Sequence, residues 1–280
     1  MTQTPRAGAL ALCLWCAWAP QAFSTDAARA PADGATAAAI AAFRAGDHGA
    51  VAALRGPAEA GHAAAQFYLG LAYAKGWGVV ADDERARDYY ARAAAAGYAK
   101  AQVNLGLQLA AAGDFAGARA WLERAAQQGD GRAAHQLGLM HYRGHGGPRD
   151  YRAAREWWRQ GAARGNAEAA FNLGILHHRG LGVAVDRDSA LYWWLQAARS
   201  GLPVAQNAVG TAYQNGDGAP FDLVEAWAWF RLAGAGGLDV ARLNAELVSA
   251  RLDADGQARA EQRLTALRAE LAEAPGDATR

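Results

Sequence analysis

The chain contains very little cysteine and lysine. Its 280 residues include two cysteines, Cys13 and Cys16, and two lysines, Lys75 and Lys100. Because both cysteines lie in the first 24 residues, the rest of the chain has no thiol for a disulfide, a zinc site or a nucleophile. No serine is followed by lysine three residues later, so the serine–lysine arrangement of penicillin-recognising enzymes is also absent.

An excess of charge of one sign is missing as well. Lysine and arginine together number 28 against 27 aspartates and glutamates, which gives a net charge of +1. A nucleic-acid-binding protein usually carries a strongly basic face, so we expect no nucleic-acid partner. No stretch of the chain approaches the ~20 apolar residues of a membrane-spanning helix, so we also expect no membrane span.

The first residues have the pattern of a secretory signal. Arg6 precedes a short apolar run at residues 7–19, which Pro20 ends. Small residues suited to cleavage follow, so we expect processing near Ser24 or Ala30. The sequence thus predicts a signal peptide at residues 1–24, a flexible linker at 25–34, and export to a bacterial periplasm.

A pattern repeats five times between residues 63 and 238. A glycine preceded by leucine or valine recurs at intervals of 36, 32, 36 and 36 residues, and an alanine stands five residues before each of them. These glycines are Gly70, Gly106, Gly138, Gly174 and Gly210. A further glycine closes each unit. Such a period is typical of solenoids built from helix hairpins.

Each repeated position has a physical role in a hairpin of two helices. The small residues of the first helix let the second helix approach closely. In four units a loop with two glycines follows, as in "GWGV", and then an aspartate suited to begin the second helix. That helix carries an adjacent aromatic pair, such as Trp157 and Trp158. Since neighbouring residues on a helix point about 100° apart, one aromatic should face its own hairpin and the other the neighbouring repeat.

These units resemble Sel1-like repeats, which are relatives of the tetratricopeptide repeat. The segment "AEAAFNLGILHHRGLGVAVDRDSALYWWLQAARSG" is a close match, whereas the shorter second unit is closer to a tetratricopeptide repeat. The resemblance implies an all-α, right-handed α-solenoid of stacked helix hairpins. The five units are expected at residues 63–98, 99–130, 131–166, 167–202 and 203–238.

The two ends are expected to complete the stack. Residues 35–62 suggest a degenerate first hairpin, and residues 239–275 suggest a C-terminal helical cap with a polar back, because a solenoid needs its open end covered.

The adjacent histidines His177 and His178 are best explained by the repeat. His141 and His177 fall three residues after the repeat glycine, where the family prefers a tyrosine packed between the two helices, and each should have one bonded nitrogen. His178 falls one step further, at a position that faces the concave groove in tetratricopeptide repeats. Equivalent positions in stacked repeats are about 10 Å apart, which disfavours a shared metal ion, and no cofactor is expected.

The concave groove is the candidate binding site, and its occupant is expected to be another protein with an extended or acidic segment. The predicted groove residues lie on the first helices of the units: Phe67, Tyr68, Leu71, Lys75, Asn104, His135, Tyr142, Arg143, Phe171, Asn172, His178, Arg179, Asn207, Thr211, Gln214 and Asn215. Lys75, Arg143 and Arg179 form a basic column suited to carboxylates. The alternative interpretation of this column is ordinary surface charge.

No catalytic motif is present, so the sequence predicts a scaffold or regulatory adaptor rather than an enzyme. It has no phosphate loop, no "HExxH" and no "GxSxG". Exported proteins that resemble it include regulators and scaffolds of exopolysaccharide systems. A cell-wall or glycan-binding module that uses groove aromatics is the alternative function, and a hydrolase is a third.

Overall fold

The structure, a computed structural model, describes residues 34–273, which form fourteen α-helices and one short 3₁₀ helix, with no β-strand in that range. The predicted signal peptide and almost all of the predicted linker lie outside the described residues. In chain order the elements are α1 (Gly34–Arg44), η2 (His48–Ala50), α2 (Val51–Glu59), α3 (Ala63–Lys75), α4 (Asp83–Ala95), α5 (Ala99–Ala111), α6 (Phe115–Gln127), α7 (Gly131–Arg143), α8 (Tyr151–Ala163), α9 (Ala167–Arg179), α10 (Arg187–Arg199), α11 (Pro203–Asn215), α12 (Leu223–Ala235), α13 (Asp239–Ser249) and α14 (Ala254–Glu273).

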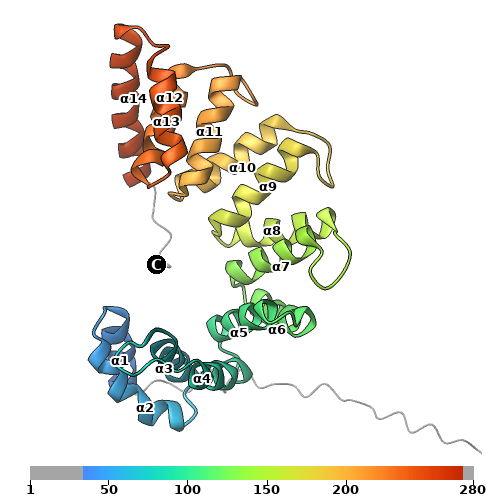
Figure 1. Cartoon of the computed structure of the whole chain (residues 1–280), viewed down its shortest axis with the longest axis vertical. Helices are drawn as coiled ribbons and strands as arrows, with labels where there is room; N and C mark the ends of the chain where they lie inside the picture. Colours follow the sequence, from blue (N-terminus) through green and yellow to red (C-terminus); the bar gives the residue numbers. More distant parts are fainter. Residues whose placement is uncertain (1–33, 274–280) are drawn as a thin grey trace, which may run out of the picture.

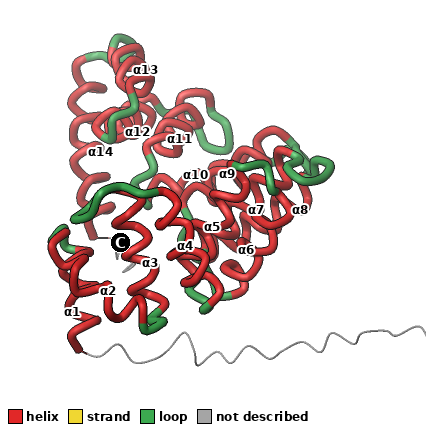
Figure 2. The backbone as a smooth tube through the Cα atoms, turned by 60° about the horizontal axis from the view of Figure 1, so that its bottom comes forward, coloured by secondary structure: helices red, strands yellow, loops and turns green. Residues whose placement is uncertain are grey.

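The helices are arranged as a solenoid of stacked hairpins. Each of the pairs from α3–α4 to α11–α12 packs together, and the second helix of one pair packs on the first helix of the next. The pairs follow one another in an arc from α1 to α14 (Figure 1). Short loops connect them (Figure 2). The predicted all-α, right-handed α-solenoid is therefore confirmed.

The repeated aspartates and glycines set the helix ends. Asp82, Asp150, Asp186 and Asp222 each precede a second helix, and each accepts at least one backbone N–H from its first turn. Gly76, Gly144, Gly180 and Gly216 each end a first helix at a φ between 68° and 77°, which glycine adopts without the strain of a side chain. The predicted helix starts are thus confirmed at these four aspartates.

The second aromatic of each pair packs against the repeat glycine of its own hairpin. A methyl group at Gly138 would lie 2.3 Å from the Trp158 indole, and one at Gly174 would lie 2.3 Å from Trp194. The first aromatic of this pair, Trp157, packs against a cluster that combines side chains of the preceding repeat with side chains of α7 in its own repeat. The glycine is therefore required by the ring that covers it.

Each double-glycine loop packs on the preceding repeat. The middle residue of the loop contacts the start of the previous second helix, and the chemistry of this contact differs along the chain. His145 stacks on Phe115 with ring centres 4.8 Å apart, whereas Asp217 lies 3.1 Å from Arg187. These loop contacts couple neighbouring hairpins in addition to the helix packing.

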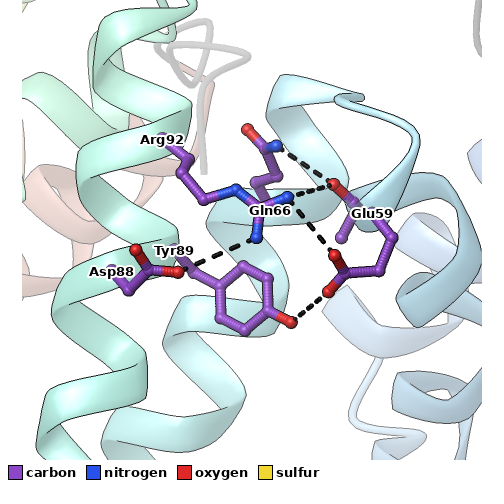
Figure 3. Close-up of polar contacts among 6 residues, drawn as sticks. Glu59, Gln66, Asp88, Tyr89 and Arg92 are labelled. Carbon is purple, nitrogen blue, oxygen red and sulfur yellow. Dashed lines mark hydrogen bonds and ion pairs between the residues drawn. The ribbon is translucent and has the colours of Figure 1, made fainter.

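A polar network ties the first hairpin to the first repeat (Figure 3). The Tyr89 hydroxyl on α4 donates a 2.7 Å hydrogen bond to Glu59 at the end of α2. Arg92 lies 3.5 Å from the same carboxylate and donates to the Ala58 carbonyl, to which Gln66 also donates. Burial and the Glu59 contact raise the pKa of Tyr89 to about 12, so its hydroxyl remains a donor at neutral pH.

Removing this hydroxyl should loosen the first hairpin. In Tyr89→Phe, hydrogen exchange of the amides in residues 34–59 is expected to speed up by about threefold, because one partly exposed hydrogen bond to a carboxylate is lost. Tyr192→Phe is the matched control, since Tyr192 is an exposed tyrosine on α10, and it should leave these amides unchanged. Equal exchange in both variants would contradict the assigned role.

The C-terminal helices differ from the expected polar cap. The exposed side of α14 is polar apart from alanines, but α13 exposes Val240, Leu243 and Leu247. The expectation of a polar back is therefore wrong for α13. Among residues 34–273, none of the helices has the length and apolar character needed to cross a membrane.

Candidate protein-binding site

A pocket of about 360 Å³ lies where α9, α10 and α11 meet. At this part of the predicted groove, the described side chains surround a pocket. Its walls come from three helices and the loop after α11: Phe171, Ile175, His178, Arg179, Trp194, Asn207, Ala208, Thr211, Ala212, Asn215 and Asp217. Four of the α9 side chains have helical spacing, so they share one face of that helix.

The pocket combines apolar and polar walls. Phe171, Ile175 and Trp194 supply apolar surface; Trp194 belongs to the core, and Phe171 packs against it. Asn207, Thr211 and Asn215 supply polar groups from α11. A concave site with apolar walls and a few polar groups is the usual form of a binding pocket.

A short chain of side chains closes one edge of the pocket. His178 Nδ1 lies 3.2 Å from Arg187 Nη1, which lies 3.1 Å from Asp217 Oδ1. Burial, together with Arg187, lowers the pKa of His178, and its neutral ring accepts from the guanidinium. Asp217 balances the charge of Arg187, whereas Arg179 has no ion-pair partner within residues 34–273. Arg179 therefore provides the available positive charge of the pocket.

The structure brings six of the sixteen predicted groove residues together in this pocket. They are Phe171, His178, Arg179, Asn207, Thr211 and Asn215. The basic column is not one site, because Lys75 and Arg143 are exposed on other repeats and do not line the pocket. Leu71 and Gln214 are half-buried outside it.

Phe67 and Tyr68 are core residues, and their assignment to an open groove needs correction. Each is only 7% exposed. Tyr68 contacts Phe43 of α1, with ring centres 6.0 Å apart, and Phe67 contacts Tyr98, at 5.1 Å. The first hairpin covers this end of the groove. Sugar rings stack on exposed aromatic faces, which these two side chains do not offer.

Other predicted groove residues hold neighbouring helices together. Asn172 Nδ2 on α9 lies 3.0 Å from His135 Nε2 on α7. Burial lowers the pKa of His135, so the neutral ring can accept this hydrogen bond. Asn104 hydrogen-bonds to the Tyr90 hydroxyl, and Tyr142 packs beside Trp158 at 5.5 Å. Part of the hydrogen-bonding and packing surface of these side chains is therefore used within the protein itself.

The two histidines at the tyrosine position are half-buried, but neither ring forms the expected hydrogen bond with any residue between 34 and 273. Nδ1 of His177 is buried and has no hydrogen-bond partner in the described part of the chain. Burial lowers the pKa of both His141 and His177. The tyrosine hydroxyl at the equivalent position of the first repeat does find a partner, since Arg85 donates to Tyr73.

Replacing both histidines should reduce the sensitivity of the fold to acid. Because their pKa values are lower in the folded than in the unfolded chain, the unfolded chain takes up protons first as pH falls below about 6.5, and stability is lost. Between about pH 7.5 and 5, the free energy of unfolding of the double variant His141→Tyr, His177→Tyr should therefore fall less than that of wild type. Urea denaturation at the two pH values measures both changes. An unchanged pH dependence would contradict this account.

Five pocket residues were missed by the sequence analysis: Ile175, Trp194, Ala208, Ala212 and Asp217. Ile175 occupies the same repeat position as Leu71, which was predicted to line the groove. The repeat pattern could therefore have placed Ile175 there as well. Trp194 belongs to an aromatic pair that was expected only to pack within and between hairpins, yet its ring also forms a wall. Asp217 is a loop residue, and its contact with Arg187 has no counterpart in the other loops. No cluster of three or more metal-ligating side chains occurs between residues 34 and 273.

The comparisons with known proteins identify the repeat. The Sel1 repeat family matches five consecutive segments, residues 63–98, 99–130, 131–166, 167–202 and 203–238. The chain belongs to the Sel1 repeat family. Sel1 repeats form a non-catalytic scaffold fold, and proteins built from them generally bind other proteins. No curated protein matches the chain.

Solved structures of Sel1 repeat proteins have the same fold. A protective antigen of uropathogenic Escherichia coli with the SLR fold is 29% identical, with a TM-score of 0.72 over 80% of this chain and 50% of that one. This Sel1 repeat protein therefore spans about half the length of that antigen. A Sel1 repeat protein from Oxalobacter formigenes is 29% identical, with a TM-score of 0.68 over 75% and 85% of the two chains. An immunity protein of Pseudomonas aeruginosa, 19% identical with a TM-score of 0.52 over 75% of this chain and 84% of that one, shares the fold.

Proposed function

We propose that this Sel1 repeat protein is an adaptor that binds an extended segment of another protein in the pocket between α9 and α11. The observation that carries the proposal is the pairing of apolar walls with one available cation. Phe171, Ile175 and Trp194 suit an apolar side chain, and Arg179 suits a carboxylate beside it. At about 360 Å³, the pocket is at the small end of the ~300–1,000 Å³ range of ligand sites, which suits a short stretch of chain.

The polar α11 wall supports a peptide occupant. Asn207, Thr211 and Asn215 lie on one face of α11 and carry donors and acceptors. A bound extended chain has backbone N–H and C=O groups that lose water on binding and need such partners. The wall thus supplies hydrogen bonds along the chain, while Arg179 supplies preference for an acidic residue.

The adaptor is further proposed to act after export. The support is the positive residue Arg6, the apolar run at residues 7–19 and the small residues after it. The proposal predicts that the protein recovered from the periplasmic fraction begins at or near residue 25 or 31, which mass spectrometry of its N-terminal peptide measures. Recovery of the unprocessed chain from the cytoplasm alone would refute it.

Site-specific crosslinking tests the binding proposal. A photoreactive residue at Thr211, inside the pocket, should give a discrete protein adduct in the native host. The same probe at Gln160, an exposed residue of α8, is the control and should give none. The adduct should disappear when Arg179→Glu is combined with the Thr211 probe. Identical adducts from both positions would contradict binding in the pocket.

A further inference from the structure

Helix α13 carries an exposed apolar stripe that the packing of the described helices does not explain. Val240, Leu243 and Leu247 are 49%, 59% and 66% exposed. Their spacing of three and four residues places them on one side of α13. The other side, which includes Ala241, is buried, and α13 packs on α12. No helix between residues 34 and 273 covers the stripe.

The stripe begins beside the binding pocket. Asn244 Nδ2 on α13 donates a 3.0 Å hydrogen bond to Asn207 Oδ1 on α11, and Asn207 lines the pocket. Leu243 is the chain neighbour of Asn244, and Leu247 follows one turn later. The pocket and the stripe therefore meet at Asn207.

The repeat register places the two leucines at pocket-lining positions. Leu243 and Leu247 follow Asn207 and Thr211 by 36 residues, which is the length of most units. The α13 helix thus acts as the first helix of a sixth, incomplete unit. At the positions where α11 offers polar groups to the pocket, α13 offers aliphatic ones. The groove is therefore positively charged at Arg179 and apolar at α13.

We propose that the partner segment extends beyond the pocket onto α13 and has two parts, an acidic residue at Arg179 and large aliphatic residues on the α13 stripe. This inference rests on the proposed function and names the chemistry of the partner. Charge sets the direction of the segment: Arg179 attracts an acid, whereas the exposed carboxylate of Glu246 stands at the edge of the stripe and disfavours one.

The geometry also fixes the spacing within the segment. Neighbouring first helices lie about 10 Å apart, so two steps from α9 to α13 cover about 20 Å. An extended chain advances about 3.3 Å per residue. The acidic residue and the aliphatic residues should therefore be separated by about six residues.

Selection from a random library of 12-residue peptides displayed on phage tests this inference, with the purified protein as the target. We expect selected peptides to share an acidic residue and, about six residues away, one or two leucine-like residues. A synthetic peptide of the selected consensus should bind Leu243→Ser with Leu247→Ser at least tenfold more weakly than wild type, as two apolar contacts are lost. Val80→Ser, another exposed aliphatic change, is the control and should not alter the affinity.

The possible results separate the inference from the proposed function. Peptides that depend on Arg179 but show no aliphatic preference, and bind the double variant normally, would overturn the α13 inference and leave the pocket as the site. If the selection yields no binding peptide, or if the selected peptides bind Arg179→Glu as tightly as wild type, both the α13 inference and the proposed function would be overturned. Sedimentation that shows a dimer lost in the double variant would assign the stripe to a second copy and overturn the inference. Circular dichroism should show an unchanged melting temperature for the double variant.

Discussion

Replacing Trp158 with alanine is expected to lower the free energy of unfolding by about 3–5 kcal/mol. Trp158 is the largest fully buried side chain of the described residues, with 1% of its surface exposed. Its ring lies against Gly138, and its indole N–H donates a 3.1 Å hydrogen bond to the His135 carbonyl. The substitution removes the ring from the centre of the third repeat and leaves that carbonyl without its side-chain donor.

The measurement is urea denaturation followed by circular dichroism. Tyr192→Ala is the control, because Tyr192 is a large aromatic that is 55% exposed, and it should change stability by less than about 0.5 kcal/mol. Each unit of a solenoid contacts mainly its neighbours. Hydrogen exchange should therefore rise first in residues 131–166. A loss below about 1 kcal/mol for Trp158→Ala would contradict its role in joining the two helices.

Gly218→Ala should destabilise the fold by about 3 kcal/mol, from two separate causes. Gly218 has a φ of 73°, a conformation that costs an alanine about 1 kcal/mol. The added methyl group would also lie 2.3 Å from the Arg187 carbonyl oxygen. Such a contact forces the loop away from α10, with a further cost of about 2 kcal/mol. The Asp217–Arg187 ion pair at the pocket edge should be lost with it.

Gly201→Ala isolates the cost of the backbone conformation. Gly201 has a φ of 84°, but a methyl group there would meet nothing within 4 Å. This variant should lose only about 1 kcal/mol. Thermal and urea unfolding of the two variants measure the difference directly. Equal losses would show that the loop does not dock tightly on α10.

The repeat made most of the fold predictable. The glycine of each first helix, the loop aspartates and the aromatic pairs recur at fixed spacing, and each has a local physical reason that a single sequence reveals. The hairpins and their stacking follow from these positions. The N-caps at Asp82, Asp150, Asp186 and Asp222 were correctly expected for the same reason.

The binding site was less predictable, because equivalent positions have different neighbours. Phe67 and Phe171 occupy the same repeat position, yet Phe67 is buried by neighbouring aromatics and Phe171 lines a pocket. The pocket edge depends on Asp217, a residue that varies between loops. The exposed stripe on α13 arises because no further unit packs there within the described residues. Such differences come from tertiary contacts between units, which a local pattern does not encode.

The most direct test of the account uses the partner segment that crosslinking in the pocket identifies. The measurement compares the affinity of this segment for the Arg179→Glu variant with its affinity for wild type. Fluorescence anisotropy with a labelled peptide of that segment measures it. Loss of the charge-assisted hydrogen bond and repulsion of the acid should weaken binding by about 30-fold, which corresponds to about 2 kcal/mol. Arg87→Glu, the same charge reversal on an exposed position of α4, should leave the affinity within about twofold of wild type. Equal affinities for Arg179→Glu and wild type would contradict the claim that this pocket binds the partner.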